Sequence, residues 1–337
     1  MYNLLGLCLA LAALLCANVA ATLLSIALWR VLRRRLARRS ASAQAQILLY
    51  LRLLPFACAT LFVCGFIIPA YLHHEPHPTH EVVSFKLALF AACCLMGLAL
   101  ALWRGLRSFV ATRRLIADWM RHSEPLALAN ARLPVYRVRH RFPVIAVVGV
   151  LRPRLFIASH LFEELSAEEL HAAMMHEHGH LAAHDNLKRA ALRACRDVLM
   201  LIPAGRTLDD AWNEHSEAAA DEYASRAGDA SLALDLASAL VKIARLAPAG
   251  ATPRRMPAGA FLVSEHGARG IAWRVARLAH LATNEPPRPH ASNAALNLLL
   301  ACALAAALLV SATISLSRPQ ALVPLHGALE HVVEALE

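Results

Sequence analysis

Residues 166–183 read SAEELHAAMMHEHGHLAA, and this stretch predicts the helix around which the rest of the chain is organised. Ser166 and Glu169 have the spacing of a helix capping box, and no proline follows within the stretch. His176 and His180 are four residues apart, so on a helix their imidazoles lie on one face, about 6 Å apart along the axis. The sequence therefore predicts that the two rings can grip one metal ion.

With Glu177, these histidines form the HExxH pattern, which is typical of zinc sites that carry their own base. A catalytic zinc needs a third protein ligand and one open position. Glu217, on a second predicted helix that starts near Thr207, is the best candidate for that ligand. Asp221 lies one turn beyond it on the same face, where it can accept a hydrogen bond from a ligating histidine and fix its orientation.

The chain has 18 histidines, so other positions were weighed as ligands. His184 continues the same helix face, but it lies about 12 Å along the axis from His176, too far for both to bind one ion easily. We expect His184 to be exposed at the helix end. His178 points to another face and is expected to be structural or at the surface.

The composition indicates a membrane protein, with 58% hydrophobic and only 17% charged residues. We expect four helices that cross the bilayer. They cover Leu4 to Trp29, Leu53 to Leu72, Leu87 to Trp103 and Ala294 to Leu316.

Arginines cluster after the first and third of these spans, which places those flanks on the cytoplasmic side. Four regions follow. They are three spans in 1–103, a cytoplasmic domain in 104–291, the fourth span in 292–316 and a short extracytoplasmic tail in 317–337.

The same flanking arginines account for most of the net charge of +10, so the charge favours lipid headgroups and argues against nucleic acid. The loop from His73 to Glu81 contains four histidines and two glutamates on the outer side. It can serve as a weak metal site or a pH-sensitive input, although a solvated connector is the simpler interpretation. The segment from Pro324 to Glu337 predicts a short surface helix.

Several segments from Pro143 to Asp221 resemble the core of membrane-embedded gluzincin peptidases. The similar families are the BlaR/MecR-type antirepressor peptidases and the HtpX-like and CAAX-prenyl protease group. The matching segments are FPVIAVVG (142–149), RPRLFI (152–157), LSAEEL (165–170), the HExxH pattern, HDN (184–186) and EAAAD (217–221). The chain ends about 21 residues after the fourth span, so the penicillin-binding domain of the beta-lactam transducers is not expected.

The expected fold is a mainly α membrane protein with four transmembrane helices and a cytoplasmic α+β zincin-like (gluzincin) metalloprotease domain. Short strands are expected at Pro134 to His140, Pro143 to Gly149 and Arg154 to Ser159. In gluzincins an edge strand beside the site pairs with the substrate backbone, and the resemblance assigns that edge to Val144 to Val148.

The expected activity is zinc-dependent hydrolysis of peptide bonds in a cytoplasmic or membrane protein, with one Zn²⁺ as cofactor and Glu177 as general base. The expected location is a bacterial plasma membrane. The partners are a peptide or protein substrate and the lipid bilayer, with no nucleic acid, and the sequence leaves open whether the chain forms a homo-oligomer. Regulatory signalling is the favoured role. A quality-control protease and a signalling scaffold with an inactive or structural zinc site remain alternatives.

Overall fold

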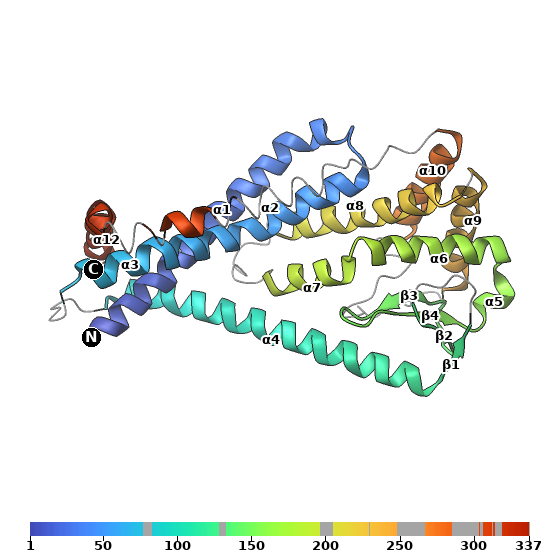
Figure 1. Cartoon of the computed structure of the whole chain (residues 1–337), viewed down its shortest axis with the longest axis horizontal. Helices are drawn as coiled ribbons and strands as arrows, with labels where there is room; N and C mark the ends of the chain where they lie inside the picture. The colour runs from blue at the N-terminus through green and yellow to red at the C-terminus, as the bar shows by residue number, and fades with distance from the viewer. Residues whose placement is uncertain are drawn as a thin grey trace.

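The computed structural model describes residues 1–76, 83–127, 133–195, 205–228, 230–247, 267–284, 303, 306–311, 313 and 319–336. Long helices extend from the end that carries both termini towards a small sheet at the other end (Figure 1). A second group of helices lies beside that sheet. The protein is mainly helical with one small mixed sheet, as the composition and the motifs predicted.

Among the residues that the structure describes, three stretches of helix are long and apolar enough to cross a membrane. The first is α1 (Tyr2–Leu36); the second joins α2 (Ala41–Phe62), the π-helical turn η1 (Val63–Ile67) and α3 (Ile68–His74); the third is α4 (Phe85–Arg121). They contain the first three predicted spans, while most of the fourth lies outside the described residues. Each helix is longer than the span predicted within it.

The third stretch continues well past the apolar residues 87–103. Helix α4 runs unbroken through residue 104, where the sequence placed a domain boundary, and Trp119 near its end packs edge-on against Phe156 of the sheet at 5.1 Å between ring centroids. The second stretch also reaches the domain, because Arg52 of α2 forms a buried salt bridge of 2.9 Å with Asp209. The apolar stretches and the part that carries the sheet therefore share helix α4 and are in contact through α2 and α8.

The sheet has four strands in the order β1-β2-β4-β3. Strand β2 is parallel to β4, while β1 and β3 run antiparallel to their neighbours, and β3 lies at one edge. The strands are β1 (Ser123–Leu126), β2 (Val135–Val138), β3 (Ile145–Val148) and β4 (Arg154–Ala158). The last three were predicted from their β-branched residues, and β1 was not.

The remaining helices pack around this sheet and around one another. They are α5 (Leu161–Glu164), α6 (Ala167–Ala182), α7 (Asp185–Cys195), α8 (Gly205–Arg226), α9 (Ala230–Leu246) and α10 (Gly267–Thr283). One apolar core joins β3 and β4 to α6, α9 and α10, with Phe156, Ala173 and Leu240 fully buried. This core holds α6 against the inner edge of the sheet.

The described C-terminal residues form the 3-10 turn η2 (Pro319–Leu322) and α12 (Val323–Leu336), which lies against α3. The predicted surface helix is thus present. The outer loop was predicted to start at His73, and this prediction was wrong. His73 and His74 belong to the last turn of α3, because the helix continues beyond the apolar residues. Residues 77–82 of that loop lie outside the described residues.

Candidate metal centre

Helix α6 begins with the predicted capping box. The Ser166 hydroxyl accepts the backbone N–H of Glu169, and the Glu169 carboxylate accepts the N–H of Ser166. The cap fixes where the helix starts and therefore which residues face inward. His176 and His180 fall on the inner face with ring centroids 4.8 Å apart, and both are buried.

Glu217 reaches the two histidines because α6 and α8 approach unusually closely at Gly179. A Cβ placed on Gly179 would lie 3.0 Å from the Ala220 Cα and 3.1 Å from the Tyr223 Cβ, so only glycine fits without movement. Ala220 is one helical turn beyond Glu217 on α8. The glycine inside the HExxH helix thus brings the two helix faces together.

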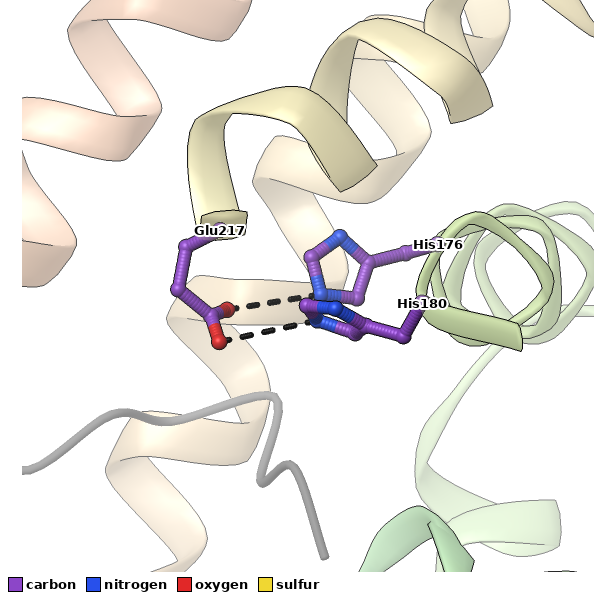
Figure 2. A group of neighbouring side chains, drawn as sticks. All are labelled: His176, His180 and Glu217. Atoms are coloured by element: carbon purple, nitrogen blue, oxygen red, sulfur yellow. Dashed lines mark ion pairs between the residues drawn. The ribbon is translucent and has the colours of Figure 1, made fainter. Parts of the chain in front are cut away.

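The side chains of His176, His180 and Glu217 converge on one point (Figure 2). Their donor atoms all lie within 4.8 Å of one another, and each imidazole Nε2 is 3.5 Å from a carboxylate oxygen of Glu217.

These atoms fit a metal ion. Both Nε2 atoms are buried and have no hydrogen-bond partner among the described residues, while Oε2 of Glu217 forms an ion pair of 3.2 Å with Arg274. Burying unpaired polar atoms costs free energy, which an ion bound between them recovers. Two ligands about 2.0 to 2.2 Å from a tetrahedral ion lie roughly 3.3 to 3.6 Å apart, as the imidazole nitrogens and Glu217 oxygens do here. The group is therefore a candidate metal site.

A carboxylate holds the outer nitrogen of each imidazole. Asp221 Oδ1 lies 2.9 Å from Nδ1 of His176, as the sequence predicted. Asp185 Oδ2 lies 2.7 Å from Nδ1 of His180 and also accepts a hydrogen bond from the Ser216 hydroxyl. Both contacts direct Nε2 towards the shared point and strengthen the imidazole as a ligand. Asp185 was not predicted from spacing, although it belongs to the HDN segment that resembles the peptidases.

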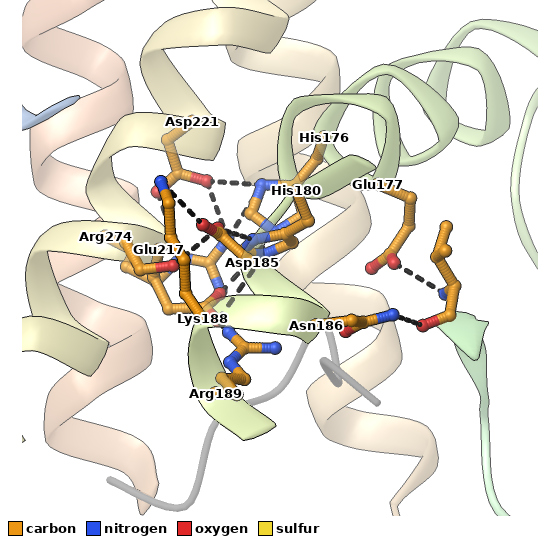
Figure 3. A network of polar contacts seen from close by, with 12 residues as sticks. His176, Glu177, His180, Asp185, Asn186, Lys188, Arg189, Glu217, Asp221 and Arg274 are labelled. Carbon is orange, nitrogen blue, oxygen red and sulfur yellow. Dashed lines mark hydrogen bonds and ion pairs between the residues drawn. The ribbon is translucent and has the colours of Figure 1, made fainter. Parts of the chain in front are cut away.

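Two arginines complete the network (Figure 3). Arg274 of α10 lies 2.6 Å from Asp221 and 3.2 Å from Glu217, and it is buried. Arg189 of α7 donates to the other oxygen of Glu217 at 3.1 Å. The sequence analysis missed both, because the helix that carries Arg274 was not predicted and Arg189 has no motif around it. They hold the Glu217 carboxylate in place.

The charges of the site favour a cation. Burial acts to raise the pKa of Glu217, but His180, His176 and Arg274 outweigh it and hold that pKa well below the usual range. Burial also acts on Asp221, whose pKa nevertheless falls to about 2 because Arg274 and His176 stabilise its charge. Burial would lower the pKa of His180, yet Glu217 and Asp185 raise it to about 9. Ionised carboxylates thus surround the histidines, where a positive charge is stabilised.

Glu177 points away from the ligand group, towards the edge strand β3 (Figure 3). Its Oε2 accepts the backbone N–H of Val147 at 2.9 Å, and its Oε1 is buried with no hydrogen-bond partner among the described residues. Burial raises the pKa of Glu177, against the opposing effects of His180, His176 and the Val147 amide. A raised pKa brings a carboxylate closer to the value that suits a general base near neutral pH.

The side chain of Asn186 also contacts the edge strand β3, at its carbonyl groups. Its side-chain amide donates to the carbonyls of Val147 and Gly149 at 2.9 and 3.0 Å. Strand β3 is thus an edge strand beside the site, as the resemblance implied, but both backbone groups of its residue Val147 are engaged by side chains.

His184 and His178, which lie near the pattern in the sequence, are not in the group. His184 is exposed in the turn between α6 and α7, as expected, and it adopts a left-handed φ of 56°. That conformation reverses the chain within one residue and brings Asp185 back to His180. His178 is buried, which agrees with a structural role.

No protein-family model and no curated protein matches the chain in sequence comparisons. The site is therefore interpreted from its own geometry.

Proposed function

We propose that the protein is an integral-membrane zinc-dependent endopeptidase that hydrolyses peptide bonds of a cytoplasmic or membrane protein. One observation carries the proposal. Two buried imidazole nitrogens without hydrogen-bond partners among the described residues, on His176 and His180, converge with the Glu217 carboxylate beside a further carboxylate, Glu177, that lies outside this group. A purely structural zinc site has no need for a carboxylate such as Glu177 beside its ligands. It normally closes its last coordination position with a protein ligand.

Zinc is the metal that this donor set suits best. Two imidazoles and one carboxylate are typical of catalytic zinc sites with one open position. When bound, zinc supplies a Lewis acid that polarises a carbonyl group and makes water more acidic.

The chain's own residues supply the proton transfers. Glu177 accepts a proton from the attacking water and passes it to the nitrogen of the leaving amine, so that the C–N bond breaks and a carboxylate and an amine form. Asp221 and Asp185 keep the two imidazoles in the orientation that the ligands need. The Val147 amide holds Oε2 of Glu177, so Oε1 is the oxygen that is available to take the proton.

The extended substrate has a place beside β3. An edge strand offers backbone N–H and C=O groups to a peptide that adds to the sheet. The outward groups of β3 include those of Val147, so a peptide that pairs there replaces Glu177 and Asn186 as their partner. The motif resemblance to both peptidase groups supports the same assignment. The resemblance to the antirepressor peptidases favours a regulatory substrate, and the resemblance to the HtpX-like group keeps membrane-protein quality control as the alternative.

The proposed arrangement in the membrane follows the arginine clusters. The domain with the metal group faces the cytoplasm, and the fourth span in 292–316 leads back to the outer side. The location proposed for this arrangement is a bacterial plasma membrane.

The test compares three proteins purified in detergent: the wild type, Glu177→Gln and the control Glu168→Gln, which changes an exposed glutamate in the first turn of the same helix. Zinc content and cleavage of casein or of the chain itself are measured. We expect one zinc at this site in all three and cleavage by the wild type and the control only. Zinc binding with equal cleavage by Glu177→Gln contradicts the mechanism. If no protein cleaves the substrates although all bind zinc, the scaffold alternative with a structural site is favoured.

A further inference from the structure

A second group of metal-ligating side chains lies at the opposite end of the molecule. Glu75 follows the last turn of α3, while His326 and Glu330 are one turn apart on α12. One atom from each of the three lies within 4.8 Å of the others. The two helices are side by side at the end that carries both termini, far from the sheet (Figure 1).

The distances in this group resemble those of the first. Nε2 of His326 is 3.7 Å from a carboxylate oxygen of Glu75 and 3.4 Å from one of Glu330. Oppositely charged groups in direct hydrogen bonds come closer, to about 2.7 to 2.9 Å. Two ligands of one tetrahedral ion are roughly 3.3 to 3.6 Å apart, so the spacing fits an ion between them better than a direct bond.

The imidazole is placed as a ligand rather than as a surface residue. Its side chain is only 12% exposed, and it lies 5.8 Å from the ring of His74. Its Nδ1 is buried without a hydrogen-bond partner among the described residues. By contrast, His331 on the same helix is 84% exposed. Packing has therefore fixed the orientation of His326, which lowers the entropy lost when an ion binds.

We propose that Glu75, His326 and Glu330 form a second metal site that binds a divalent ion of the zinc class. One imidazole and two carboxylates suit such an ion, and they match neither the all-oxygen set of calcium nor the thiolate set of a Cys-rich site. Glu330 is half exposed, so water can fill a remaining position. The ion joins the C-terminal helix to the end of the second membrane stretch.

This site is independent of the proposed peptidase activity. Its ligands come from α3 and α12, and it shares no residue with the group on α6 and α8. With the metalloprotease domain in the cytoplasm, it faces the outer solution. Metal outside the cell can thus reach it without entering the cytoplasm.

The test measures zinc bound per chain by the full-length protein in detergent, after equilibration with buffered zinc chloride. Four proteins are compared: the wild type, His326→Gln, the matched control His331→Gln and His176→Gln. We expect two ions in the wild type and in His331→Gln. We expect one in His326→Gln and one in His176→Gln, each having lost a different ion.

The outcomes separate the two sites. Equal zinc content in His326→Gln and His331→Gln overturns the outer site. A wild type with one ion that only His176→Gln loses overturns it as well, while it leaves the proposed zinc peptidase intact. A single ion lost only in His326→Gln supports the outer site and contradicts the inner one. The ion that each variant retains shows that the chain has folded.

A second measurement does not depend on counting ions. Hydrogen exchange of the backbone amides in α12 is followed with and without added zinc. Zinc is expected to slow exchange in α12 of the wild type and of Glu334→Gln, a control on the same helix, but not of Glu75→Gln, which removes the ligand from the other helix. Equal protection in Glu75→Gln and Glu334→Gln contradicts a shared ion.

Discussion

The backbone amide of Val147 donates a hydrogen bond of 2.9 Å to the carboxylate of Glu177. The proposed general base is therefore tied to the strand that the substrate is expected to join. A peptide that pairs with this edge takes the Val147 amide for itself and sets Glu177 free. In the proposed mechanism, substrate binding and release of Glu177 Oε2 therefore depend on the same hydrogen bond.

Asn186 is predicted to fix β3 rather than to take part in chemistry. Replacing it with alanine removes the donor from the buried carbonyls of Val147 and Gly149. We expect Asn186→Ala to lower the free energy of unfolding by about 1 to 3 kcal/mol and to leave zinc content unchanged. Asn284→Ala, whose hydrogen bonds are exposed, is the control for denaturant unfolding. Equal stability of the two variants contradicts this assignment.

Asp185 is predicted to strengthen His180 as a ligand. Asp185→Asn keeps the shape but weakens the contact at 2.7 Å with Nδ1 of His180. We expect zinc affinity to fall about 10- to 100-fold, as measured by competition with a chromophoric chelator. Asp210→Asn, an exposed position on α8, serves as the control and is expected to bind zinc like the wild type. Unchanged affinity in Asp185→Asn argues that His180 is not a ligand.

Zinc binding is expected to release a proton near neutral pH. The pKa of His180 is about 9 in the metal-free protein, above its ordinary 6.5, so at pH 7 the ring is protonated, whereas a ligand must be neutral. Calorimetry in buffers of different ionisation enthalpy should show the release, and it should fade as the pH rises through about 9. A binding enthalpy independent of the buffer contradicts the prediction.

The raised pKa of His180 also makes the stability of the metal-free protein depend on pH. A histidine whose pKa is raised on folding stabilises the protein fully below its unfolded value, and the contribution is lost as the pH rises through the folded value. Metal-free stability should therefore decline between about pH 6.5 and about pH 9.

Gly179 is predicted to be required for metal binding, because α8 approaches it too closely for a side chain. In Gly179→Val the added carbons push α8 and Glu217 away from the histidines, and we expect zinc to be lost. Gly105→Val in α4, where nothing lies within 4 Å, tests the general effect of valine in a helix. Normal zinc content in Gly179→Val shows that the helices can separate without harm to the site.

His184 is predicted to be replaceable by glycine. Its φ of 56° is strained for most side chains and free for glycine, so His184→Gly should keep its zinc and become more stable. His184→Val should be destabilised, since β-branched residues resist this conformation. Thermal unfolding of the two variants tests these stability predictions. Loss of zinc in His184→Gly would mean that His184 is a ligand.

The parts of the site that a helix brings together were predictable from sequence. His176 and His180 share a face because of their spacing, and Glu217 and Asp221 repeat that spacing on a second helix. The contact of Asp185 with His180 was not predicted, because the position of Asp185 depends on the left-handed conformation of His184 before it. Arg274 was not predicted, because it is 53 residues from Asp221, whose carboxylate it binds, and no local sequence pattern links the two.

The fold was predictable to a similar extent. Hydropathy predicted four apolar spans, three of which lie in helices that the structure describes, but it does not say how far a helix continues once it leaves the apolar region. Helix α4 continues to Arg121 because its last turns pack on the sheet through Trp119, a tertiary contact. Strand β1, with the sequence SEPL, has little β propensity and exists because β2 offers it a partner.

Helix α4 is one continuous helix, so a tilt at one end displaces the other end. Its 37 residues measure about 55 Å, and a tilt of about 5° at one end displaces the other by roughly 5 Å. That other end presses on Phe156 in β4, the strand bonded to β3, which holds Glu177 through Val147. A continuous series of contacts therefore connects the apolar helix α4 to the hydrogen bond that holds Glu177.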